Sequence, residues 1–144
     1  QSIVFSENTR ANAFAVRVAS DRGTFDPTLR LMIQGDEDGV PDQAPIASKS
    51  LSLGGIPVDQ NRDVTFIFNQ PFEFEKDRKY WLMLDAEGYG NGASWYTPQL
   101  HSRVFSASDE YASGAAGWLN GGGFSPSQPR PSSDWHMKIG YREP

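Results

Sequence analysis

The chain has 144 residues, which suffices for one domain with a single hydrophobic core. Thirteen basic and eighteen acidic residues give a net charge of -5, so the overall charge does not favour nucleic acid or an anionic membrane as a partner. The lack of cysteine excludes disulfides, thiol catalysis and thiolate metal sites.

Fourteen glycines, ten prolines and 12% aromatic residues favour strands joined by turns over helices. The apolar runs are too short to cross a bilayer, so no membrane insertion is expected. Residues 1–10 lack the basic and apolar regions of a signal peptide. The composition therefore predicts an all-β fold.

The N-terminal half shows several strand patterns. Residues 2–5 form a short apolar run, typical of an edge strand. Residues 13–19 and 29–34 alternate apolar and other side chains with a period of two, as expected for strands with one face in a core. Turn-forming residues fill 20–27 and 35–45, and residues 46–53 are expected to form a further strand.

Residues 64–85 are the predicted centre of the fold. They hold two apolar runs, 64–69 and 80–85, which we expect to be central strands covered on both faces. A shorter strand at 72–74 is expected between them. Pro71 must lie on an edge or at a break, and residues 76–79 should form a solvated turn.

The chain after Asp85 is richer in glycine. A loop at 87–92 leads into short predicted strands at 93–96 and 103–106, and residues 113–133 read as a long surface loop. Residues 135–141 alternate again and predict a closing strand. Together these patterns predict a single domain over residues 1–144, an antiparallel β-sandwich of roughly eight to ten strands.

The sequence shows none of the common catalytic signatures, such as a nucleophile elbow, a phosphate-binding loop or a zinc-protease motif. A zinc site would need both His101 and His136 together with carboxylates. Asp134 with His136, or Asp85 with Glu87, could be drawn into a triad or a glycosidase pair, but acidic residues are numerous and catalysis is defined by geometry. No enzyme is predicted.

An acidic segment, residues 35–42, offers closely spaced oxygen ligands to a hard cation. Its ligands would be Asp36, Asp38 and Asp42, which makes Ca²⁺ the possible cofactor. The spacing departs from the EF-hand pattern because Val40 occupies the fifth position. The alternative is a solvated turn in which Asp and Gly supply the backbone conformations.

Aromatic side chains in glycine-rich segments are the most informative functional signal. Flat rings beside amide and carboxylate groups suit a sugar, whose C–H face stacks while its hydroxyls form hydrogen bonds. The predicted ligand-binding residues are Asp85, Glu87, Tyr89, Asn91, Trp95, Tyr96 and Trp118. The alternative is that Trp95 and Trp118 close the ends of the sandwich. Trp81 is expected in the core because it lies in an apolar strand.

Several short motifs follow one another in a characteristic order: residues 29–34, the Gly39-Val40-Pro41 turn, residues 64–66, the aromatic strand 79–84, Trp95, Trp118 and the closing strand 134–141. This order resembles the accessory β-sandwich modules of bacterial secreted and surface proteins, which include choice-of-anchor domains and jelly-roll carbohydrate-binding modules. The resemblance implies a jelly-roll fold and a non-catalytic module attached to a larger extracellular protein.

The sequence thus predicts a non-catalytic carbohydrate-binding or adhesion module, located outside the cell or at its surface. Its expected partners are a polysaccharide or oligosaccharide and other domains of a larger parent chain. The alternative is a structural or assembly module, such as a spacer, an anchor-proximal domain or a virion surface domain, in which the loop aromatics would be buried against a partner.

Overall fold

The computed structural model describes residues 1–19, 28–52, 61–87, 116–120, 123–130 and 137–142, without the side chains of 18–19, 61, 85–87 and 116–130. Every regular element in these residues is a β-strand, and every strand pair is antiparallel. The prediction of an all-β, antiparallel fold is confirmed for this part of the chain.

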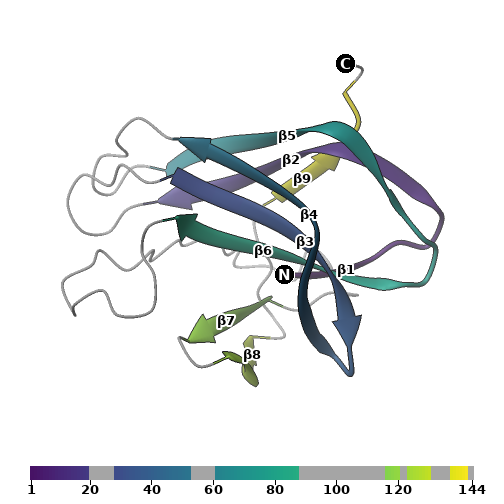
Figure 1. The fold of residues 1–144 in the computed structure, drawn as a ribbon, viewed down its shortest axis with the longest axis vertical. Helices are drawn as coiled ribbons and strands as arrows, with labels where there is room; N and C mark the ends of the chain where they lie inside the picture. Colours follow the sequence, from purple (N-terminus) through teal and green to yellow (C-terminus); the bar gives the residue numbers. More distant parts are fainter. Residues whose placement is uncertain (20–27, 53–60, 88–115, 121–122, 131–136, 143–144) are drawn as a thin grey trace.

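Two sheets form the body of the fold (Figure 1). The large sheet has the order β1 (Ser2–Val4), β6 (Lys79–Glu87), β3 (Thr28–Glu37) and β4 (Val40–Ser52). The small sheet has the order β5 (Asn61–Phe74), β2 (Thr9–Ala19) and β9 (Met137–Gly140). The first and last predicted strands are confirmed in their described parts, since β1 lies at the edge of the large sheet and β9 pairs with β2.

The hydrophobic core lies between the two sheets. It takes alternate side chains from both: Ile3, Leu29, Leu31, Ile33, Tyr80 and Leu82 from the large sheet, and Ala11, Phe14, Val16, Val64, Phe66, Phe68 and Phe74 from the small sheet. Phe14 meets Phe68 edge to face, with ring centroids 5.4 Å apart. This face of the large sheet is called the core face below.

The two predicted central strands turn out to differ. β6 lies between β1 and β3, and Tyr80 to Met83 are all buried. β5 lies at the edge of the small sheet, and Ile67 is exposed on its outer side. The prediction of burial on both faces is therefore correct for β6 and wrong for β5. The apolar Ile67 suggested that the outer side of β5 is covered, but this side chain is exposed.

Pro71 lies within the edge strand β5, at an irregular point of its pairing. Ala13 of β2 faces Ile67, whereas Ala11 faces Phe72, so residues 68–71 stand against Asn12 alone. A proline fits there because its missing N–H interrupts no ladder. The prediction for Pro71 is confirmed, and residues 72–74 continue β5 instead of forming a separate strand.

The buried side chain of Asn12 extends the small sheet past β9. Its Nδ2 donates to the carbonyl oxygen of Arg142 at 2.8 Å, and the Arg142 N–H donates to its Oδ1 at 2.7 Å. The amide thus makes the two hydrogen bonds that a paired backbone residue would make.

The segment 35–45, predicted to be a loop, is mostly strand. β3 and β4 form a hairpin around Asp38 and Gly39, whose φ angles are 53° and 86°. Two successive positive φ angles are typical of a tight type I′ hairpin turn, for which Asp-Gly is a preferred sequence. The loop prediction is wrong because only Asp38 and Gly39 form the turn, while the acidic residues on either side of it pair as strands.

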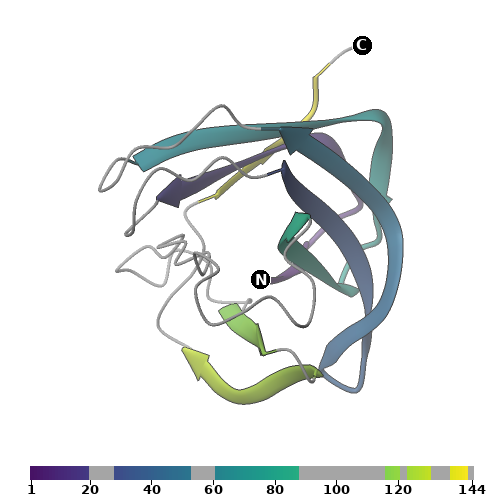
Figure 2. The ribbon, with the colours of Figure 1, turned by 60° about the vertical axis from the view of Figure 1, so that its left-hand side comes forward.

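A second correction concerns residues 113–133. Within them, β7 (Ala116–Asn120) pairs with β8 (Gly123–Arg130), so the predicted long surface loop is wrong over these residues. In both views the β7–β8 hairpin lies away from the small sheet, and β8 contacts β4 (Figures 1 and 2). The predicted strands at 93–96 and 103–106 lie outside the described residues.

Candidate functional site

Most of the predicted sugar platform falls outside the described residues: Tyr89, Asn91, Trp95 and Tyr96 all do. The backbone of Asp85 and Glu87 lies at the end of β6, and the backbone of Trp118 lies on β7 opposite Ser125. The platform therefore stays a prediction, with its first two residues on the large sheet.

Asp36, a predicted calcium ligand, is already engaged by protein donors. Its Oδ1 accepts a hydrogen bond from Trp81 Nε1 at 2.7 Å and lies 3.7 Å from Lys79 Nζ, while its Oδ2 accepts from the Gly39 N–H at 3.1 Å. The carboxylate thereby ties the β3–β4 turn to β6. The hydrogen bond from the indole to the carboxylate is charge-assisted, and such bonds are stronger than those between neutral groups.

The other two predicted calcium ligands lie at different places of the hairpin. Asp42 Oδ1 accepts from the Ala44 N–H at 3.0 Å, and its Oδ2 lies where a side chain on Gly35 would be. Asp38 occupies the turn itself. In the described ranges no three His, Cys, Asp or Glu side chains come together as a metal site would require. Calcium binding stays a prediction.

The far face of the large sheet, which points away from the small sheet, carries buried apolar side chains that lie outside the core cluster. Trp81 and Met83 are only 4% and 7% exposed, yet neither belongs to the core cluster. They alternate with Tyr80 and Leu82 of the core face, so they project to the opposite side of β6. Trp81 was expected in the core; it is buried, but on the far face and outside the core cluster between the sheets.

Across the strands, the far face combines apolar and polar side chains. Trp81 stands opposite Gln34 on β3 and Ser2 on β1, and Met83 stands opposite Met32. Ser2 and Gln34 are both buried. A buried polar group beside methionine and tryptophan is typical of binding surfaces, where a few polar groups orient a ligand on an apolar base.

Gln34 has a buried polar atom that is not satisfied. The residue is 6% exposed, and within the described part of the chain its Oε1 accepts no hydrogen bond. The large majority of buried side-chain polar atoms in proteins have a hydrogen-bond partner, and leaving one without a partner costs about 1–3 kcal/mol. Sequence reasoning missed this residue because a glutamine on a half-polar strand face gives no signal of burial.

Towards the start of β3, the far face becomes polar. Arg30 stands opposite Ser50 on β4 and Asp85 on β6. Next to them, Thr28 stands opposite Ser52 and Glu87. Hydroxyl, guanidinium and carboxylate residues thus occupy neighbouring positions on three strands, at the end of β6 from which the chain enters the predicted aromatic segment.

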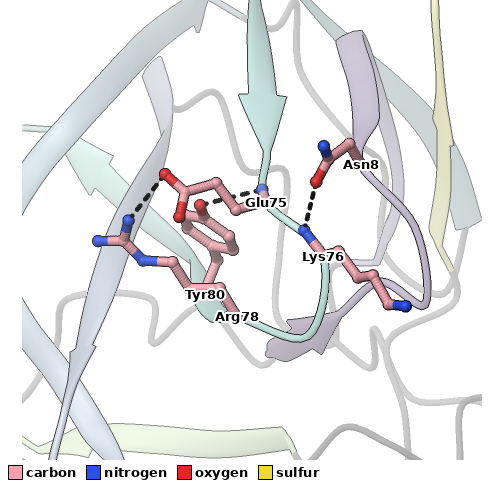
Figure 3. A network of polar contacts seen from close by, with 5 residues as sticks. All are labelled: Asn8, Glu75, Lys76, Arg78 and Tyr80. Carbon is pink, nitrogen blue, oxygen red and sulfur yellow. Dashed lines mark hydrogen bonds and ion pairs between the residues drawn. The ribbon is translucent and has the colours of Figure 1, made fainter.

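A network of polar contacts surrounds the β5–β6 turn (Figure 3). Arg78 Nη1 donates to Glu75 Oε1 at 3.1 Å, the Glu75 N–H donates to Tyr80 Oη, and the Lys76 N–H donates to Asn8 Oδ1. The hydrogen bond to Glu75 and then the nearby Tyr80 raise the pKa of Arg78. These groups satisfy one another, so the network stabilises the predicted solvated turn and offers no site.

The ion pair Arg17–Asp63 lies on the outer side of the small sheet. Arg17 Nε and Nη2 donate to the two carboxylate oxygens of Asp63 at 2.7 and 3.1 Å, and this hydrogen bonding raises the pKa of Arg17.

The residues considered for a zinc site or a catalytic triad, His101, His136 and Asp134, lie outside the described residues. In the ranges that the structure covers, no helix is long and apolar enough to span a bilayer.

The far face of β3 and β6, with its polar end at Arg30 and Asp85 and its buried end at Gln34 and Trp81, is therefore the candidate functional site. Comparison of the chain with protein-family models, with curated proteins and with solved structures gives no match.

Proposed function

We propose that the chain is a non-catalytic carbohydrate-binding or adhesion module of the extracellular space or cell surface. In this proposal the two sheets belong to a jelly-roll β-sandwich of eight to ten strands. A bound saccharide lies over the polar end of the far face and contacts the aromatic residues that follow β6.

The observation that supports this proposal most is the register of the three neighbouring strands. Ser50, Arg30 and Asp85 form one cross-strand row, and Ser52, Thr28 and Glu87 form the next. A sugar ring carries several hydroxyls that both donate and accept, so it matches a surface with hydroxyl, guanidinium and carboxylate residues side by side. Tyr89, Asn91, Trp95 and Tyr96 come immediately afterwards in the sequence.

The test is a glycan array followed by calorimetric titration of any saccharide that binds. Asp85→Asn and Trp95→Ala should each weaken binding about tenfold or more while the melting temperature stays close to that of the unmodified chain. Asp63→Asn, on the outer side of the small sheet, is the matched control and should bind normally. Repeating the titration with a chelator tests the calcium prediction. Absence of binding across a broad panel would overturn the proposal.

A structural or assembly module is the second candidate, and one observation favours it. On the outer side of the small sheet, exposed Ile67 lies in a row with Ala13 and Gly140. An exposed large apolar side chain beside small ones provides a flat surface for another chain. Sedimentation analysis would support this candidate if the chain associates and Ile67→Lys abolishes association, and would count against it if the chain is monomeric at all concentrations.

A further inference from the structure

We infer that Gln34 is a ligand-contacting residue, whose side-chain carbonyl accepts a hydrogen bond from a hydroxyl of the bound saccharide. This inference rests on the proposed function and extends its site along the far face from Arg30 towards Trp81. The unsatisfied atom is an acceptor and needs a donor, and a saccharide at the proposed site supplies hydroxyl donors.

The first argument is that the described residues leave this acceptor without a donor. Trp81 stands directly opposite Gln34, but its indole N–H donates to Asp36, two residues further along β3. Asp36 in turn is held by the Gly39 N–H and by Lys79. The neighbouring donors are thus directed to the carboxylate, and the amide oxygen of Gln34 stays available.

The second argument concerns access. Gln34 lies on β3 between Met32, which is partly exposed, and Asp36, whose side chain is 22% exposed. Alternate residues of a strand share a face, so the buried amide is flanked on both sides along β3 by side chains that reach solvent. A hydroxyl can approach it by displacing a methionine, whose unbranched side chain adapts easily.

The third argument is the cost in stability. A buried acceptor without a partner destabilises the ligand-free protein, and such costs are expected at binding sites, where function and stability oppose each other. If Gln34 serves a ligand, replacing it with an apolar side chain of similar shape must improve stability and impair binding at once. A merely structural glutamine would not give both effects.

Gln34→Met is therefore the decisive variant, since methionine is close to glutamine in shape and has no amide. We expect its melting temperature to rise by about 3 °C and its affinity for the array-selected saccharide to fall about tenfold. Leu31→Met, which places the same side chain on the core face of β3, is the matched control and should keep its affinity.

The outcomes separate the inference from the proposed function. If the unmodified chain binds a saccharide and Gln34→Met binds it equally well, the inference is wrong and the proposed function stands. If Gln34→Met melts at a lower temperature, the amide is satisfied in the free protein and the inference is also wrong. If the unmodified chain binds no saccharide, both fail.

Discussion

The two faces of the large sheet are built from the same strands and both hold buried side chains, yet they differ in chemistry. On the core face, Leu31, Ile33 and Leu82 belong to a cluster of aliphatic and aromatic side chains, and Lys49 of β4 lies partly exposed opposite Leu31. On the far face, Trp81 and Met83 lie beside Gln34 and Ser2. The buried side chains of the two faces thus differ in polarity. Buried side chains that only stabilise the fold can be apolar, as on the core face. The buried polar side chains of the far face, Gln34 and Ser2, are consistent with the proposed binding role.

The largest expected effect is the difference in stability when a glutamine is placed on the core face or on the far face of β6. Leu82→Gln places an amide in the core face, where no partner exists, and should lower the free energy of unfolding by about 5 kcal/mol. Met83→Gln, at the next position of β6, should cost only about 2 kcal/mol because polar side chains already lie nearby. Urea denaturation measures both. Equal costs at the two positions would contradict the distinction between the faces.

A smaller effect is expected at the contact between the β3–β4 turn and Trp81. Asp36→Ala leaves the Trp81 indole N–H without its acceptor, and should lower the free energy of unfolding by about 2 kcal/mol. Asp38→Asn removes an acidic group from the same hairpin without touching that contact, and should change stability by less than about 0.5 kcal/mol. A loss of similar size in both variants would show that charge, and not the indole bond, matters here.

The smallest effect tests the turn that brings Asp36 to the far face. Gly39→Ala should cost about 1 kcal/mol, because Gly39 has a φ of 86° and an added Cβ meets no neighbour, so only the backbone conformation opposes it. Gly140→Ala is matched, since its Cβ would also meet nothing, and it should be neutral. Thermal denaturation distinguishes the two, and a neutral Gly39→Ala would contradict the turn geometry.

The sequence predicted the features that depend on local pattern. The alternation of Leu29, Leu31 and Ile33 located a strand and its core face, and Pro71 marked an irregular edge. It did not predict that β5 is exposed on one side, because Ile67 is apolar whether or not a neighbour covers it. It also missed the β7–β8 hairpin, since glycine and proline occur in both loops and irregular strands.

The candidate site was predicted less well than the fold. Asp85 and Glu87 were proposed from their position after an apolar strand, and their pairing with β3 adds Thr28 and Arg30 to that surface. The contact between Asp36 and Trp81 joins residues 45 positions apart, and the unsatisfied amide of Gln34 depends on where every neighbouring donor points. Neither can be read from residue types, because both depend on the register between strands.

The Asn12 side chain, which takes the place of a backbone residue opposite Arg142, has a consequence for folding. This contact closes a loop of 130 residues, and β9 pairs with β2 across a similar separation. Contacts so distant in sequence are entropically costly to form early, and domains dominated by them fold in milliseconds to seconds. During synthesis, β2 can therefore pair with β9 only after residues 137–140 have been made. Until then, the backbone N–H and C=O groups on that edge of β2 are unpaired by β9 and can pair with other strands.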